Sequence, residues 1–102
     1  MKAHELLLLL AAATGPLPAA AHDAPTGWAY DASCCSNIDC RAIPASTLSE
    51  GPTGYLISIS NETVPYGDKR LKDSPDGLVH WCTINGRDDA RTICLYVPPR
   101  SY

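Results

Sequence analysis

The sequence lacks the features that most directly mark a membrane-spanning or nucleic-acid-binding protein. Its longest apolar run, Leu6–Ala13, is far shorter than the ~20 residues that a helix needs to cross a bilayer. Lys and Arg number 8 against 11 Asp and Glu, so the net charge at pH 7 is -3, and no cluster of basic residues offers a nucleic-acid face. We therefore expect no nucleic-acid partner and no transmembrane segment after cleavage.

Several motifs that carry chemistry are also missing. The sequence has no C-x-x-C, which argues against a thioredoxin-like redox centre, and no C-x-x-C-H for haem attachment. The spacing C-C-x4-C followed by two single cysteines fits a zinc site poorly, and no Ser-His-Asp arrangement is recognisable. The sequence thus indicates no reaction, and we favour a protein that is not an enzyme.

The first residues have the layout of a secretory signal peptide. Lys2 supplies a positive start, Leu6–Ala13 an apolar centre, and Ala19–Ala21 the small residues that a signal peptidase recognises. We expect residues 1–21 to be removed, which leaves residues 22–102 as a single exported domain that is either periplasmic or secreted.

The mature segment is typical of a small β-rich domain. Residues 55–60 alternate, with Tyr55 and Ile57 on one face, and Pro65 places the next strand at a sheet edge because proline lacks an amide donor. Residues 23–39 show little periodicity. We expect a mainly β, disulfide-stapled domain of about four to six short strands with an irregular N-terminal arm.

The clearest pair of strands lies near the C-terminus, in residues 78–84 and 91–97. If Cys82 faces Cys94, the residues that share one face of the hairpin form a coherent apolar surface. The resulting cross-strand pairs include Trp81–Leu95 and Thr83–Ile93. Directly opposed side chains lie ~4.5–5.5 Å apart at Cβ, which is close to the range of a disulfide. We predict the disulfide Cys82–Cys94.

The other three cysteines, Cys34, Cys35 and Cys40, lie close together in the sequence, at the end of the arm. In an oxidising compartment a disulfide is the usual state of such cysteines. Bonding adjacent Cys34 to Cys35 is strained, because their Cα atoms are only ~3.8 Å apart. We expect Cys40 to pair with one of them and the other to be left over. The leftover sulfur is either a thiol with a redox or partner-linking role or a buried, inert cysteine, unless the cysteines pair differently.

Metal binding through histidine is an alternative function. Cleavage after Ala21 makes His22 the new N-terminus, with an amine and a ring nitrogen for one ion. His80 is the only other histidine of the mature chain, and imidazole suits copper or zinc. The pair resembles the copper-binding histidine brace of lytic polysaccharide monooxygenases and of some periplasmic copper carriers. The competing interpretation is a flexible N-terminal His22 and a surface or hydrogen-bonded His80, without a cofactor.

The hypothesis that we favour is a binding or structural module of the cell envelope, with an envelope protein or a glycan as its partner. Aromatic side chains are common in binding surfaces, and Trp28, Tyr30 and Tyr102 are the candidates here. The same residues can instead cover a thin core.

Four segments carry a resemblance to a known group of proteins. They are "WAYDASCCSNIDC", "VPY", "SPDGLVHWC" and "ICLYVPP". The chain resembles a family of small exported alphaproteobacterial proteins that share a Cys-Cys…Asp-Cys cluster, a Ser-Pro-Asp-Gly turn and a C-terminal Cys…Pro-Pro. The resemblance implies export and a common disulfide-stapled fold, and it implies no activity.

Overall fold

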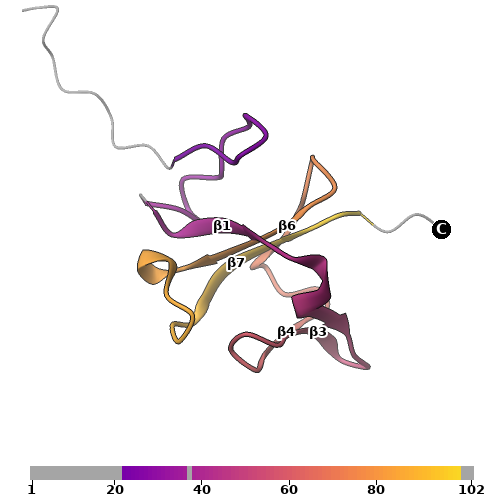
Figure 1. The fold of residues 1–102 in the computed structure, drawn as a ribbon. Helices are drawn as coiled ribbons and strands as arrows, with labels where there is room; N and C mark the ends of the chain where they lie inside the picture. The colour runs from indigo at the N-terminus through magenta and orange to yellow at the C-terminus, as the bar shows by residue number, and fades with distance from the viewer. Residues whose placement is uncertain (1–21, 37, 100–102) are drawn as a thin grey trace, which may run out of the picture.

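The computed structural model describes residues 22–36 and 38–99. These residues form the mainly β structure that the sequence predicts, with seven short strands in two sheets (Figure 1). The strands are β1 (Cys40–Ile43), β2 (Leu48–Glu50), β3 (Gly54–Ile57), β4 (Glu62–Pro65), β5 (Leu71–Asp73), β6 (Val79–Thr83) and β7 (Thr92–Val97), with single 3-10 turns at Ala45–Thr47 and Ile84–Gly86. The predicted signal peptide, residues 1–21, and Tyr102 lie outside the described residues.

The larger sheet has the order β1-β6-β7-β5 and the smaller one the order β2-β3-β4. β5 runs parallel to β7, whereas the other neighbouring strands are antiparallel. No helix in the described part of the chain has both the length and the apolar character needed to span a bilayer.

β6 and β7 form the antiparallel hairpin that the sequence predicts. Trp81 pairs with Leu95, and Cys82 pairs with Cys94, so the predicted register is confirmed over this stretch. The register sends alternate side chains of both strands to opposite faces of the sheet.

A bulge changes the pairing at the end of this hairpin. Thr83 pairs with Thr92, not with Ile93 as we predicted. The extra residue on β7 brings Ile93 to the same side of the sheet as Cys94. It also turns Thr92 toward Trp81, whose indole nitrogen donates to Oγ1 of Thr92 at 2.8 Å.

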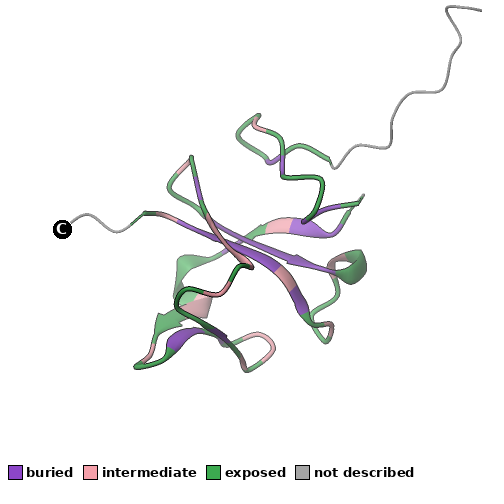
Figure 2. Ribbon diagram, turned by 180° about the vertical axis from the view of Figure 1, so that it is seen from behind, coloured by how far each residue is buried: buried purple, intermediate pink, exposed green. Residues whose placement is uncertain are grey.

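The larger sheet is covered on both faces, so every residue of β6 is buried. Figure 2 shows this burial along the crossing strands at the centre of the molecule. Between the two sheets lie Ile43, Tyr55, Ile57, Val64, Val79, Trp81, Leu95 and Val97. On the opposite face, under the arm, lie Ala24, Tyr30, Cys34, Cys35, Cys40, Cys82, Cys94 and Tyr96.

The two disulfides differ from those that we predicted. Cys40 is bonded to Cys82, and Cys34 is bonded to Cys94. The predicted Cys82–Cys94 bond is therefore wrong, and so is the predicted bond from Cys40 to Cys34 or Cys35. The reason is that β6 lies inside the sheet, so Cys82 has a cysteine directly opposite it on both neighbouring strands, Cys94 on β7 and Cys40 on β1.

The arm turns sharply at Asp31 above this face. The Asp31 carboxylate accepts hydrogen bonds from the amide and the hydroxyl of Ser33, at 2.8 and 2.7 Å, which is a common use of aspartate in turns. Its carbonyl accepts from the amides of Cys34 and Cys35, and its own amide donates to the Tyr96 hydroxyl at 3.0 Å. The turn thereby directs two adjacent cysteines into the core, each 1% exposed.

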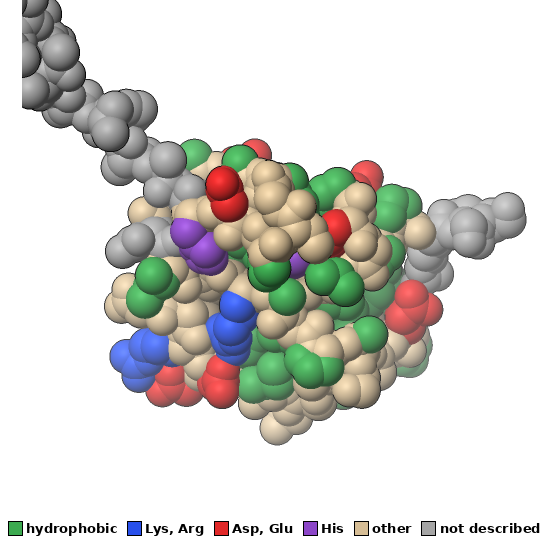
Figure 3. Space-filling view, turned by 45° about the horizontal axis from the view of Figure 1, so that its top comes forward, with side chains coloured by type: hydrophobic (Ala, Val, Ile, Leu, Met, Phe, Trp, Pro, Cys, Tyr) green, Lys and Arg blue, Asp and Glu red, His purple; other side chains and the backbone are tan. Residues whose placement is uncertain are grey.

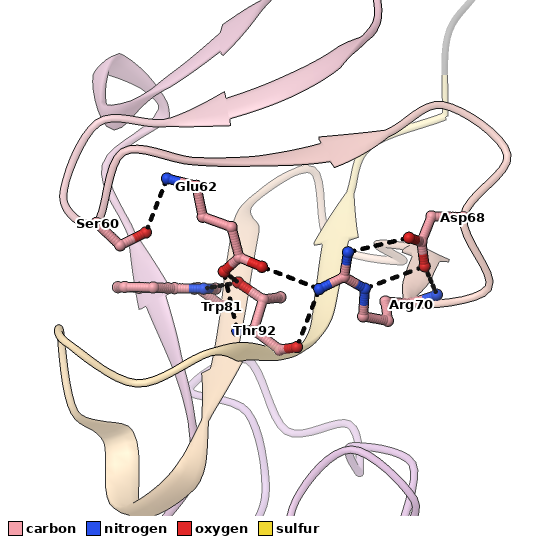
Figure 4. A network of polar contacts seen from close by, with 6 residues as sticks. All are labelled: Ser60, Glu62, Asp68, Arg70, Trp81 and Thr92. Atoms are coloured by element: carbon pink, nitrogen blue, oxygen red, sulfur yellow. Dashed lines mark hydrogen bonds and ion pairs between the residues drawn. The ribbon is translucent and has the colours of Figure 1, made fainter.

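A polar network joins the two sheets (Figure 4). The carboxylate of Glu62 on β4 accepts from the amide and hydroxyl of Thr92 on β7, at 3.0 and 2.6 Å. It also accepts from Arg70 at 2.9 Å, and Arg70 forms a second ion pair with Asp68. Because Thr92 in turn accepts from Trp81, the network gives the buried indole nitrogen its hydrogen-bond partner.

Candidate functional site

The histidines of the described chain gather where the arm covers the larger sheet. Tyr30 lies between them, with its ring centroid 5.2 Å from that of His22 and 5.4 Å from that of His80. Trp28 packs edge-on against both Tyr30 and His80. His22 is exposed and His80 is fully buried. Figure 3 likewise shows one open patch of histidine surface and one that neighbouring side chains almost cover.

Asp76, from the Ser-Pro-Asp-Gly turn, is the polar centre of this face. Its carboxylate accepts from Thr26 Oγ1 (2.7 Å), Trp28 Nε1 (2.9 Å), Ser74 Oγ (2.7 Å), the Leu78 amide (3.0 Å) and His80 Nε2 (2.9 Å). Burial alone would raise the pKa of this carboxyl. The hydrogen bonds, those from Thr26 and Trp28 first, outweigh that effect and hold the pKa of Asp76 far below its ordinary value of 3.8.

Both ring nitrogens of His80 have protein partners. Nε2 faces the two carboxylate oxygens of Asp76 at 2.9 Å, and an ionised carboxylate can only accept, so Nε2 carries the proton. Nδ1 lies 2.8 Å from the Tyr30 hydroxyl. Burial, followed by the charge of Asp76 and then Cys35, raises the pKa of Tyr30 to about 12. Tyr30 is therefore protonated, and its hydrogen bond to Nδ1 completes the chain Asp76–His80–Tyr30.

Cys35 and His22 form a second pair at the edge of the same cluster. Cys35 takes part in neither disulfide, so it is the leftover cysteine of the predicted pair Cys34 and Cys35. Its Sγ lies 3.2 Å from Nδ1 of His22. The sulfur is buried while the imidazole is exposed, so this pair connects the interior of the arm-covered face with solvent.

The structure does not bring His22 and His80 together as a metal-binding pair. Each ring contacts Tyr30, and both nitrogens of His80 are used by Tyr30 and Asp76. Within residues 22–36 and 38–99, no group of three or more His, Cys, Asp or Glu side chains is placed to hold a metal ion. Of the two predicted ligands, only His22 points a ring nitrogen toward a further potential ligand, Cys35.

Trp28 and Tyr30, the predicted binding aromatics, cover the core. Tyr30 is 3% exposed and Trp28 is half-buried with its indole nitrogen bound to Asp76. Of the two interpretations that the sequence left open for them, the structure shows the core-covering one.

Two open grooves border the Pro98–Pro99 segment. They have volumes of about 280 and 410 Å³. Both are lined by Tyr55, Val97, Pro98 and Pro99. The smaller adds Tyr66, Leu71, Lys72 and Asp73, and the larger adds Leu48, Glu50 and Val79.

Sequence reasoning missed Asp76 and these grooves. The Ser-Pro-Asp-Gly sequence indicates a turn at Asp76, and the place of Asp76 four residues before His80 was a usable signal for their contact. The grooves had no signal, because Tyr55 on β3 and Tyr66, in the turn directly after β4, meet Val97 only after the two sheets have packed.

The chain matches no protein-family model, no curated protein and no solved structure.

Proposed function

We propose that this protein is exported and acts as a disulfide-stabilised binding module of the cell envelope. The two disulfides support export, because such bonds persist in oxidising compartments. They also attach the arm and β1 to the central hairpin, which gives a domain of this size the covalent support that a thin core requires.

The observation that carries the binding function is the pair of grooves beside Pro98 and Pro99. On the arm-covered face, Asp76, His80 and Tyr30 satisfy one another, and among the described residues no buried side-chain nitrogen or oxygen lacks a hydrogen-bond partner. Those groups therefore hold the fold together. The grooves, by contrast, are open, mainly apolar and edged by a few charged groups, which is the usual composition of a binding site.

The smaller groove suits a glycan of the envelope. Tyr66 is 39% exposed and presents its ring at the groove, held edge-on against Tyr55. Lys72 and Asp73 lie at the same groove. An aromatic ring can stack on the C–H face of a sugar, while an ammonium and a carboxylate nearby can bind its hydroxyl and charged groups.

Co-sedimentation of the exported protein with purified cell-wall glycan tests this function. We expect saturable binding that is weakened at least tenfold in Tyr66→Ala and unchanged in Ile84→Ala, an exposed apolar residue that lines neither groove. Thermal unfolding checks that both variants are folded. Absence of binding, or equal binding by the two variants, would contradict the glycan function, and retention on immobilised envelope proteins alone would favour a protein partner.

Export is tested separately by the intact mass of the protein recovered outside the cytoplasm. We expect a chain that begins at His22 and contains two disulfides and one thiol. A chain that retains residues 1–21, or that carries no disulfide, would overturn the proposed location.

A further inference from the structure

We propose that the mature chain binds one Zn²⁺ or Cu⁺ ion through the α-amine and Nδ1 of His22 and Sγ of Cys35. The inference rests on the proposed export, because cleavage before His22 creates the amine. The described side chains supply two of the three ligands, and signal-peptide removal supplies the third.

The separation of the two side-chain ligands matches a metal site. Nδ1 of His22 and Sγ of Cys35 are 3.2 Å apart. Metal–sulfur and metal–nitrogen bonds of about 2.3 and 2.0 Å place two ligands of one ion roughly 3.2–3.6 Å apart. An ion can therefore enter between the two atoms with little movement of either residue.

The ring nitrogen that faces the sulfur is the one that can chelate with the terminal amine. Nδ1 and the α-amine of the same histidine close a six-membered ring around an ion, whereas Nε2 points away from the main chain. Because it is Nδ1 that faces Cys35, the ring nitrogen that chelates with the amine is also the one that lies beside the sulfur.

The surrounding residues hold these ligands in place. The ring of His22 packs edge-on against Tyr30, with the ring planes at 64°. The amide of Cys35 donates to the Asp31 carbonyl at 3.2 Å, which fixes the backbone beside the sulfur. A buried sulfur next to an exposed imidazole leaves the ion a fourth position open to water or to a partner's ligand.

The local charge and the donor types favour a cation of this class. Burial alone would raise the pKa of Asp39, but hydrogen bonds from Ser36 and Asn85 and the charge of His22 together lower it, so an ionised carboxylate lies near His22. Thiolate and imidazole ligands select Zn²⁺ and Cu⁺ over Ca²⁺ and Mg²⁺, which prefer oxygen ligands.

The test uses the exported protein, freed of metal with a chelator under anaerobic conditions. Its mass is measured first to establish that the chain begins at His22. Zn²⁺ is then titrated by calorimetry, Cu⁺ by competition with a coloured chelator, and Co²⁺ serves as a probe whose thiolate charge-transfer absorption reports a metal–sulfur bond.

Three variants assign the ligands. We expect one ion per chain, an affinity at least 100-fold lower in Cys35→Ser together with loss of the charge-transfer band, and an affinity at least tenfold lower when one extra alanine precedes His22. Asp23→Asn, an exposed carboxylate next to His22, is the matched control and should bind as the unaltered protein does.

Two results would overturn the inference. A chain that begins at His22 and binds neither ion, or a Cys35→Ser variant that keeps the original affinity, would show that this site is not formed, while the proposed export would stand. A chain that begins elsewhere would overturn the cleavage site and the metal site together.

Discussion

Nε2 of His80, on the central strand β6, lies 2.9 Å from both carboxylate oxygens of Asp76. The same carboxylate accepts hydrogen bonds from Thr26 and Trp28 of the arm. One aspartate in a turn therefore connects the arm to the centre of the larger sheet, and the Cys34–Cys94 disulfide connects the arm to the same sheet covalently.

Replacing His80 should destabilise the protein strongly. In His80→Leu, the buried hydroxyl of Tyr30 and the carboxylate of Asp76 each lose a partner, which should lower the free energy of unfolding by about 2–4 kcal/mol. Urea unfolding with the disulfides intact measures the change. Ile84→Ala, at an exposed position, serves as the control and should change the value by less than about 0.5 kcal/mol. Equal effects of the two substitutions would mean that the Asp76–His80–Tyr30 chain does not form.

Acid should unfold the protein by protonating Asp76. The pKa of this carboxyl is lower in the folded protein than its ordinary value of 3.8, so its contribution to stability is complete above that value and is lost as the pH falls toward the folded pKa. The lowered pKa values of Asp39 and Glu62 act in the same direction. We expect the free energy of unfolding to change little between about pH 5 and pH 9 and to decrease below about pH 4.

A substitution at Asp76 isolates the contribution of this carboxyl to the loss of stability at low pH. Asp76→Asn should be less stable than the unaltered protein at pH 7 and should lose less stability between pH 5 and pH 2, as followed by urea unfolding at each pH. Parallel losses in the two proteins would assign the acid sensitivity to other carboxyls.

Peptide mapping without reduction should distinguish the observed disulfides from the predicted ones. Trypsin cuts after Lys and Arg, so Cys34, Cys35 and Cys40 stay together in residues 22–41, while Cys82 lies in residues 73–87 and Cys94 in residues 92–100. The observed bonds join all three peptides into one species. A Cys82–Cys94 bond would instead join only the last two. We expect the three-peptide mass, with the thiol of Cys35 alkylated before digestion.

The inter-sheet network should tolerate little change at Thr92. Thr92→Val removes the acceptor of the buried Trp81 indole and a donor to Glu62, which should lower the free energy of unfolding by about 1–3 kcal/mol. Thr63→Val, an exposed position on β4, is the matched control and should stay within about 0.5 kcal/mol. A small effect at both positions would show that the network does not hold the sheets together.

Local pattern was sufficient for the parts of the fold that depend on neighbours in the chain. The alternation around Trp81 and Leu95 predicts the β6–β7 register, and Pro65 predicts an edge strand, which β4 is. Local pattern was insufficient for β5. Leu71–Asp73 is too short to show a period, and it pairs in parallel with β7, which is distant in the sequence. The alternation of side chains along residues 91–97 also did not indicate the bulge beside Ile93.

The sequence by itself determined that this is a mainly β domain with paired cysteines, because side-chain alternation and cysteine content are properties of the chain. Only the tertiary structure decided which cysteines pair, since Cys82 meets Cys94 through the hairpin but meets Cys40 only once β1 has joined the sheet. The same holds for the site residues: Cys35 meets His22 across the turn of the arm, and His80 is engaged by Asp76 and Tyr30. Those contacts depend on how the arm folds over the sheet, and the spacing of residues along the chain does not encode that path.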